Sequence, residues 1–165
     1  MTRLTGLPPV IGPATRVLVL GSFPGVASLR AQQYYGHPRN QFWTILGSLW
    51  SLDLMAMAYV DRLACVRDRG LGIWDVYASC EREGSLDADI RDPVLNDLSA
   101  LLTHCRGLQA FAHNGGESFR HARHTRALGL PVYRLPSTSP ANASWSFDRK
   151  LAAWAEVLRQ HGVAP

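Results

Sequence analysis

Residues 21–25 (GSFPG) follow the apolar run of residues 17–20 (VLVL) and combine residue types that can hold a flat ligand. An apolar run that contains β-branched residues and ends in a glycine-bracketed turn is typical of a buried strand leading into a tight loop. Glycine and proline let the backbone come close to a ligand, and the aromatic Phe23 between them can stack on a planar group. The loop lacks the G-x-G-x-x-G and G-x-x-x-x-G-K patterns, so it is neither a dinucleotide fingerprint nor a P-loop.

A second segment, residues 34–43 (YYGHPRNQFW), follows shortly afterwards. It places an imidazole, a guanidinium and an amide, those of His37, Arg39 and Asn40, between two pairs of aromatic residues. Together with residues 21–25, this segment is where we expect the chemistry of the protein.

Apolar runs alternate with helical patterns along the chain. The predicted strands are residues 17–20, 72–76, 108–112 and 131–135. The predicted helices are residues 40–49, 57–69, 93–104, 117–128 and 146–161, the third opened by Asp92 with Pro93 at its first position. This order predicts a single α/β domain over residues 1–165, a three-layer α/β/α sandwich with a central four-stranded parallel sheet.

Polar residues follow each predicted strand. Asp75 closes residues 72–76, Asn114 follows residues 108–112 in the sequence HNGG, and a hydroxyl-rich loop, residues 136–143, follows the last strand. Ligands of open parallel sheets lie at the carboxyl ends of the strands. We therefore expect these loops to converge with residues 21–25 on one composite pocket.

The composition limits the classes of partner and cofactor. The formal net charge is +4, and Lys150 is the only lysine among 17 basic residues, so arginine, whose planar fork suits phosphate, carries the positive charge. This modest excess is compatible with a nucleic-acid partner without requiring one. Three widely spaced cysteines favour reduced thiols over disulfides or a metal cage, so we expect no metal and no cofactor. No segment is long enough to span a membrane and the N-terminus lacks the form of a signal peptide, so we expect a cytoplasmic protein. We further expect a monomer and, with DNA as the partner in a prokaryote, association with the nucleoid.

Two motifs resemble those of a known family. Residues 21–25 with residues 36–43 (GHPRNQFW) resemble the first motif of the uracil-DNA glycosylase superfamily, and the nearest branch is that of the hypoxanthine-DNA glycosylases. Residues 135–142 (LPSTSPAN) are similar to the Ser/Pro-rich loop with which the family contacts DNA. The resemblance covers nearly the whole chain. It implies an α/β/α sandwich and an enzyme that hydrolyses the bond between a deaminated base and its sugar.

The resemblance implies Asn40 as the catalytic residue. Fast members of the superfamily place an aspartate in the first motif to assist the attacking water, and the equivalent position here is Phe23. The amide of Asn40 cannot remove a proton at neutral pH, but its oxygen can orient the water. Because a general base contributes ~10²–10⁴-fold, its loss predicts a slower enzyme. A second role for Asn40, as the N-cap of the helix that follows, is compatible with the first.

The base pocket implied by the resemblance comprises Gly21, Ser22, Phe23, Asp75 and Asn114. The ring of Phe23 would stack on the base; the alternative is that it lies in the core. Asp75 would meet an N–H of the base or stabilise a protonated purine, and Asn114 would face a base edge. Their alternatives are a turn cap or arginine partner for Asp75 and a left-handed turn for Asn114.

The DNA strand would be held by Arg39 and by the hydroxyl-rich loop, through Ser137, Thr138, Ser139 and Asn142. Pro140, Ala141 and Asn142 are small, so any wedge inserted into the duplex is short. Arg120, Arg123 and His124 are either further phosphate contacts or a solvated helix face. Whether His37 or His113 protonates the leaving base stays open.

The sequence thus predicts a metal-free DNA repair glycosylase that flips the damaged base from the helix and leaves an abasic site. Hypoxanthine is the first substrate, with uracil or xanthine second. The alternative is a non-catalytic module of the same fold that binds damaged DNA or a nucleotide. A weaker third reading is a hydrolase of small nucleotides that binds phosphate at Gly115 and Gly116.

Overall fold

The computed structural model describes residues 2–165 and contains the predicted four-stranded parallel sheet. Its strands are β2 (Val17–Gly21), β3 (Leu71–Asp75), β6 (Ala110–Asn114) and β7 (Val132–Leu135), in the order β3-β2-β6-β7. The register sets Gly21 beside Asp75, and Asn114 beside Leu135. The four carboxyl ends therefore lie at one edge, as the sequence predicted.

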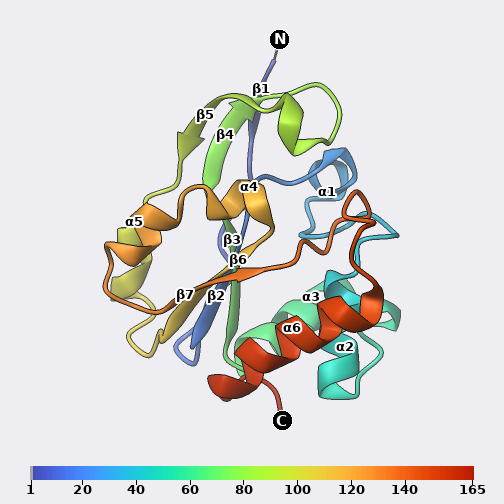
Figure 1. The fold of residues 1–165 in the computed structure, drawn as a ribbon, viewed down its shortest axis with the longest axis vertical. Helices are drawn as coiled ribbons and strands as arrows, with labels where there is room; N and C mark the ends of the chain where they lie inside the picture. The colour runs from blue at the N-terminus through green and yellow to red at the C-terminus, as the bar shows by residue number, and fades with distance from the viewer. Residues whose placement is uncertain (1) are drawn as a thin grey trace.

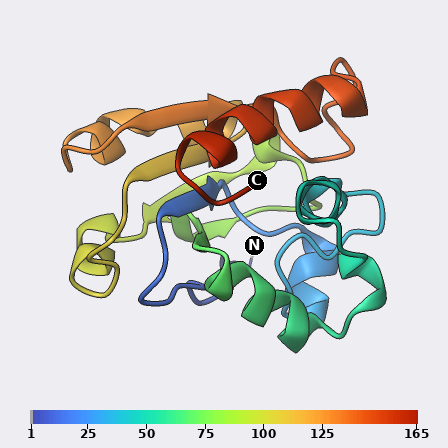
Figure 2. The same cartoon turned by 90° about the horizontal axis from the view of Figure 1, so that it is seen from below.

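Helices cover both faces of this sheet (Figure 1). One face packs on α2 (Phe42–Trp50), α3 (Tyr59–Asp68) and α6 (Phe147–Gln160) through Val17 and Val19 of β2. Leu18 and Leu20 point to the other face, in a second core cluster to which η3 (Leu98–Thr103) contributes, while the short helices α4 (Gly116–Phe119) and α5 (Ala122–Arg126) lie against β6 and β7. Successive side chains of β2 point to opposite faces, and both faces are covered, so β2 is buried throughout. The predicted sandwich is confirmed. Figure 2 shows α6 lying along one face of the sheet.

A small antiparallel sheet extends beyond the parallel one and was not predicted. It consists of β1 (Arg3–Thr5), β4 (Tyr77–Glu81) and β5 (Arg91–Leu95), in the order β1-β4-β5. The connection from β4 to β5 contains η2 (Asp87–Asp89). The remaining elements are α1 (Val26–Ala31) and η1 (Leu54–Ala56).

The predicted helix over residues 93–104 is wrong in its first part and is reduced to the 3-10 helix η3 in its second part. Its first residues form the exposed strand β5, where Pro93 is tolerated because the strand lies at the edge of the sheet. Asp92 has a φ of 49° and caps nothing. Asp97 caps the short η3 instead, since its side chain accepts a hydrogen bond from the Ser99 N–H.

The other predicted helices are confirmed with shifted ends, except that residues 117–128 form two short helices, α4 and α5. This segment has few apolar residues to pack, and helices in proteins depend chiefly on such packing. Helix α6 begins after Ser146, whose hydroxyl accepts from the Arg149 N–H, as a serine N-cap should. Across residues 2–165, no helix has the length and apolar character needed to cross a membrane.

Candidate active site

Gly21 and Asp75 lie side by side at the ends of two neighbouring strands. A Cβ built on Gly21 would lie 2.5 Å from Asp75 Oδ1 and 3.2 Å from the hydroxyl oxygen of Tyr35. Only glycine fits at this position, because any side chain would have to displace a buried carboxylate. The three residues lie close together at the carboxyl edge of the sheet, where the sequence places the ligand.

Asp75 is a buried carboxyl group in an unusual electrostatic environment. The residue is 4 % exposed, and no atom in residues 2–165 makes a hydrogen bond to its Oδ2. Burial raises the pKa of Asp75 to about 7; the negative charge of Asp87 adds to the rise and Arg82 opposes it. An unpaired buried acid at the end of a strand is a functional-site candidate on physical grounds.

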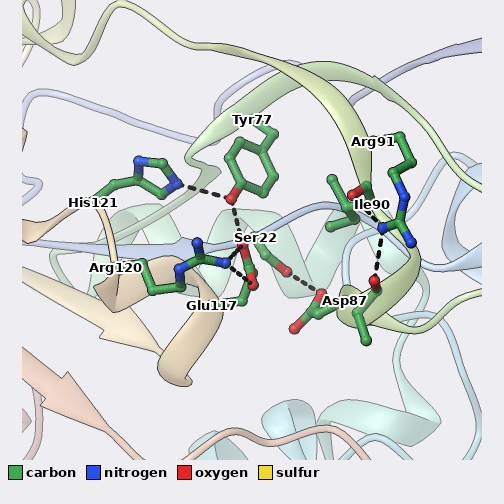
Figure 3. Close-up of polar contacts among 9 residues, drawn as sticks. Ser22, Tyr77, Asp87, Ile90, Arg91, Glu117, Arg120 and His121 are labelled. Atoms are coloured by element: carbon green, nitrogen blue, oxygen red, sulfur yellow. Dashed lines mark hydrogen bonds and ion pairs between the residues drawn. The ribbon is translucent and has the colours of Figure 1, made fainter.

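Residues 82–90 form hydrogen bonds with the loop after β2, residues 22–26. Ser22 donates a hydrogen bond to Asp87 Oδ1 over 2.6 Å (Figure 3), and the Val26 N–H donates to the Ser85 hydroxyl over 2.9 Å. The Arg82 guanidinium donates to the Pro24 carbonyl over 2.6 Å. These contacts fix the loop from the side opposite the sheet.

Phe23 lies in the core. Its side chain is only 7 % exposed, Arg82 lies over its ring at 5.4 Å from the centroid, and Gly6 closes the ring edge. The sequence offered two positions for this ring, on the base or in the core, and the ring has no open face in this structure.

A further polar cluster, which the sequence did not predict, lies near the Ser22–Asp87 hydrogen bond (Figure 3). Tyr77 donates to Glu117 Oε2 over 2.5 Å and lies 2.8 Å from His121 Nε2. Arg120 pairs with the same Glu117 at 3.1 Å while its own side chain stays largely exposed. Arg120 can therefore still reach solvent or a phosphate.

Asn40 supports the start of α2 without being its N-cap, which is Gln41. The Asn40 Oδ1 accepts a hydrogen bond from the N–H of Phe42, the first residue of the helix, at 2.9 Å. The amide is half-buried, and a carbonyl oxygen has a second lone pair that can hold a water. Phe42 in turn stacks on Tyr35, with 4.2 Å between ring centroids, and Tyr35 lies beside Gly21.

Asn114 and Thr138 join two of the converging loops. The Asn114 amide donates to the Thr138 hydroxyl and accepts from the Thr138 N–H, both at 3.0 Å. The Thr138 carbonyl accepts from the Gln41 N–H, so a third segment is tied to the same residue. Thr138 is fully buried. Its place is therefore inside the protein, between the ends of β6 and β7 and the start of α2.

The other predicted DNA contacts lie nearer the surface. Ser137, Ser139 and Asn142 are half-buried, and Arg39 is exposed. The Ser137 and Ser139 hydroxyls accept from N–H groups two residues ahead, and Asn142 donates to the Ser137 carbonyl, so the loop holds its own shape.

His113 is buried and structural in its contacts. Its Nδ1 lies 2.8 Å from the Ser118 hydroxyl and its Nε2 lies 2.9 Å from the Thr125 hydroxyl. Burial lowers the pKa of His113 to about 4, so the ring is neutral at physiological pH. Of the two histidines considered as proton donors, only His37 is exposed.

Comparison with known proteins places the chain in a family. A model described as the uracil DNA glycosylase superfamily matches residues 8–158. The chain belongs to this superfamily. It is a monofunctional DNA N-glycosylase, a hydrolase of the bond between base and deoxyribose, and DNA is its substrate.

Two relatives carry a more specific description. The chain is 39 % identical over 155 residues to a hypoxanthine DNA glycosylase of Methanosarcina barkeri, covering 94 % of this chain and 98 % of the relative. It is 37 % identical over 154 residues to a hypoxanthine DNA glycosylase of Methanosarcina acetivorans, covering 93 % and 97 %. A solution NMR structure of a candidate uracil DNA glycosylase from Methanosarcina acetivorans matches with a TM-score of 0.87 at 36 % identity, covering 96 % and 98 % of the two chains.

We expect Thr138→Val to lower the free energy of unfolding by roughly 1–3 kcal/mol, because it leaves the buried Asn114 N–H without an acceptor. Chemical denaturation measures the loss. Thr103→Val is the matched control, since the Thr103 hydroxyl is exposed and donates only to the Ala100 carbonyl. Equal stability of the two variants would show that the Asn114–Thr138 contact does not hold the loops together.

Proposed function

We propose that this protein removes hypoxanthine from DNA, with uracil and xanthine as secondary substrates, and leaves an abasic site. The observation that carries the proposal is the buried carboxyl group of Asp75 beside Gly21, whose Oδ2 has no hydrogen-bond partner in residues 2–165. Deaminated bases carry a ring N–H next to a carbonyl, and a carboxylate can accept that N–H. The descriptions of the two Methanosarcina relatives support the choice of hypoxanthine.

The target base must leave the helix to reach the Asp75 carboxyl group, which is buried in the protein. Flipping costs a few kcal/mol, which contacts in the pocket offset. The bond between C1′ and the base nitrogen then breaks, and its electron pair leaves with the base. Water adds to C1′ and loses a proton, while the departing base gains one.

Asn40 orients the attacking water in this proposal. Its Oδ1, already fixed by the Phe42 N–H, offers its second lone pair to one hydrogen of the water. No carboxylate takes up the proton at the position of Phe23, so catalysis depends on positioning and on stabilising the leaving base. A slow turnover is expected for this reason.

Asn114 has a supporting part in the proposal. Both ends of its amide are bound to Thr138, so it positions the wall of the pocket through that residue. Gly21 places no side chain against the Asp75 carboxyl group, and the Ser22 hydroxyl holds the loop to Asp87.

The DNA backbone would lie across the half-buried Ser137, Ser139 and Asn142, with Arg39 reaching a further phosphate. Hydroxyl and guanidinium groups are suited to phosphate oxygens and carry no sequence preference. We further propose that the protein acts as a monomer in the cytoplasm, close to the DNA. Pro93 on the exposed edge strand β5 supports the monomer, because proline interrupts pairing with a second chain.

The test is base release from matched oligonucleotides that carry one deoxyinosine, deoxyuridine or deoxyxanthosine. Each is assayed single- and double-stranded, with alkaline cleavage of the abasic product. Release from deoxyinosine above the other two supports the proposal. Tight binding with no release at stoichiometric enzyme would instead support a non-catalytic module, and activity on free nucleotides alone would support a nucleotide hydrolase.

The position of Phe23 gives a prediction of its own. We expect Phe23→Leu to keep base release within about twofold and Phe23→Ala to cost ~3–5 kcal/mol of stability, because the ring fills the core. Single-turnover rates and denaturation of both variants measure this. A large loss of rate in a stable Phe23→Leu variant would assign the ring to stacking on the base.

A further inference from the structure

Three buried side-chain atoms in residues 2–165 have no hydrogen-bond partner: Tyr35 Oη, Asp75 Oδ2 and Arg82 Nη1. Buried polar groups are nearly always paired, so such atoms call for an explanation. Two of the three residues, Tyr35 and Asp75, lie against Gly21, where a Cβ would be 3.2 Å from Tyr35 Oη and 2.5 Å from Asp75 Oδ1. One of them has a hydroxyl and the other a carboxyl, so an unpaired donor and an unpaired acceptor lie close together beside the end of β2.

The backbone holds Tyr35 in a conformation that is costly for a large residue. Its φ is +54°, in the left-handed region, and its ring is fixed by stacking on Phe42. Asn114 is near enough to lower the Tyr35 pKa, but its amide is bound to Thr138 and makes no regular hydrogen bond to the hydroxyl. Burial raises the pKa of Tyr35 above its usual range, with Asp75 adding to the rise, so the hydroxyl keeps its proton and remains a donor.

The preceding residue, Tyr34, shows the opposite arrangement. Its hydroxyl oxygen lies 3.1 Å from the Leu7 carbonyl and 2.8 Å from the Pro8 carbonyl, to which it donates. The two adjacent tyrosines thus differ in their hydrogen bonds: the hydroxyl of Tyr34 has partners within the protein and the hydroxyl of Tyr35 has none in residues 2–165.

We propose that Tyr35 determines specificity by donating its hydroxyl hydrogen to the exocyclic carbonyl of the base, while Asp75 accepts the adjacent ring N–H. This inference rests on the proposed function and specifies which edge of the base is recognised. Hypoxanthine, xanthine and uracil all present this carbonyl and N–H pair.

Adenine and cytosine, from which hypoxanthine and uracil arise, present the reverse pattern of an amino group and a bare ring nitrogen. Against them the Asp75 carboxylate would face a bare ring nitrogen, which is also an acceptor, and the Tyr35 hydroxyl could only accept from the amino group and not donate. Sites built to hydrogen-bond one pattern reject the other strongly, because buried polar groups are then left unpaired. Guanine has the same carbonyl and ring N–H, so Tyr35 and Asp75 do not distinguish it from hypoxanthine, and other residues must exclude it.

The experiment compares Tyr35→Phe with Tyr34→Phe in single-turnover base release from a deoxyinosine oligonucleotide. We expect Tyr35→Phe to lose about 10- to 100-fold in rate without loss of stability, since it removes a buried donor that the fold leaves unpaired. We expect Tyr34→Phe to lose stability, because two carbonyls lose their donor, and to keep its rate within about twofold.

A second substrate separates recognition from a merely structural effect. 6-Thiohypoxanthine keeps the ring N–H and replaces the carbonyl oxygen with sulfur, a weaker acceptor. Wild type should prefer the oxygen substrate by a larger ratio than Tyr35→Phe, whose ratio should shrink about 10-fold because the donor is gone. Equal ratios in the two proteins would overturn the inference while leaving the proposed function intact. Absence of base release by wild type from every oligonucleotide would overturn both.

Discussion

Replacing Asn40 with alanine is expected to reduce base release by at least about 100-fold, because the water would lose the group that orients it. The expectation follows from the absence of a carboxylate at Phe23 and from the contact of Asn40 with Phe42, which stacks on Tyr35. Single-turnover rates on deoxyinosine DNA measure the loss. A rate within about twofold of wild type would remove Asn40 from the mechanism.

The alanine variant also loses the hydrogen bond to the Phe42 N–H at the start of α2, which costs ~1 kcal/mol of stability. Asn40→Ser controls for this effect, because a serine hydroxyl can accept from an N–H two residues ahead but is too short to reach the same water. We expect Asn40→Ser to unfold like wild type and to release base as slowly as Asn40→Ala. An active serine variant would show that the contact with Phe42 alone accounts for the effect of alanine.

Much of the architecture was predictable because it is encoded locally. Each strand of the parallel sheet is a short apolar run, and each ends in a turn with glycine or a polar residue, as at Gly21 and Asp75. Since parallel strands end at one edge, the meeting of their loops followed from the strand assignment alone. The motif resemblance then supplied the chemistry that periodicity could not.

The small antiparallel sheet was not predictable in the same way. Its strand β5 is exposed along its whole length and contains Pro93, which after Asp92 is typical of a helix start. The strand exists because it pairs with β4, a long-range contact that no local pattern reports. Tertiary pairing here outweighs local propensity.

Several site details also depended on distant contacts. The sequence identifies Tyr35 only as an aromatic residue of the motif, because no sequence pattern predicts its positive φ or its unpaired hydroxyl. Thr138 was predicted at the DNA surface because hydroxyls suit phosphate, yet it is fully buried against Asn114 and Gln41. In both cases the side chain's surroundings are formed by residues that lie far away in the sequence.

Asp75→Asn is expected to stabilise the protein, and more so as the pH rises. In the unfolded chain an aspartate releases its proton near 3.8, whereas burial raises the pKa of Asp75 to about 7 in the folded protein. Between these values the folded state holds a proton that the unfolded state has lost, so stability falls as the pH rises. At about 1.4 kcal/mol for each pH unit between the two pKa values, the loss approaches roughly 4 kcal/mol.

Urea unfolding of wild type and Asp75→Asn from pH 4 to pH 8 measures this effect. The difference in unfolding free energy should be small at pH 4, grow up to about pH 7 and then level off. Arg82 and Asp87, the charged groups that act on Asp75, are present in both proteins, so their own titration largely cancels. A difference that does not change with pH would mean that the Asp75 carboxylate is compensated in the folded state.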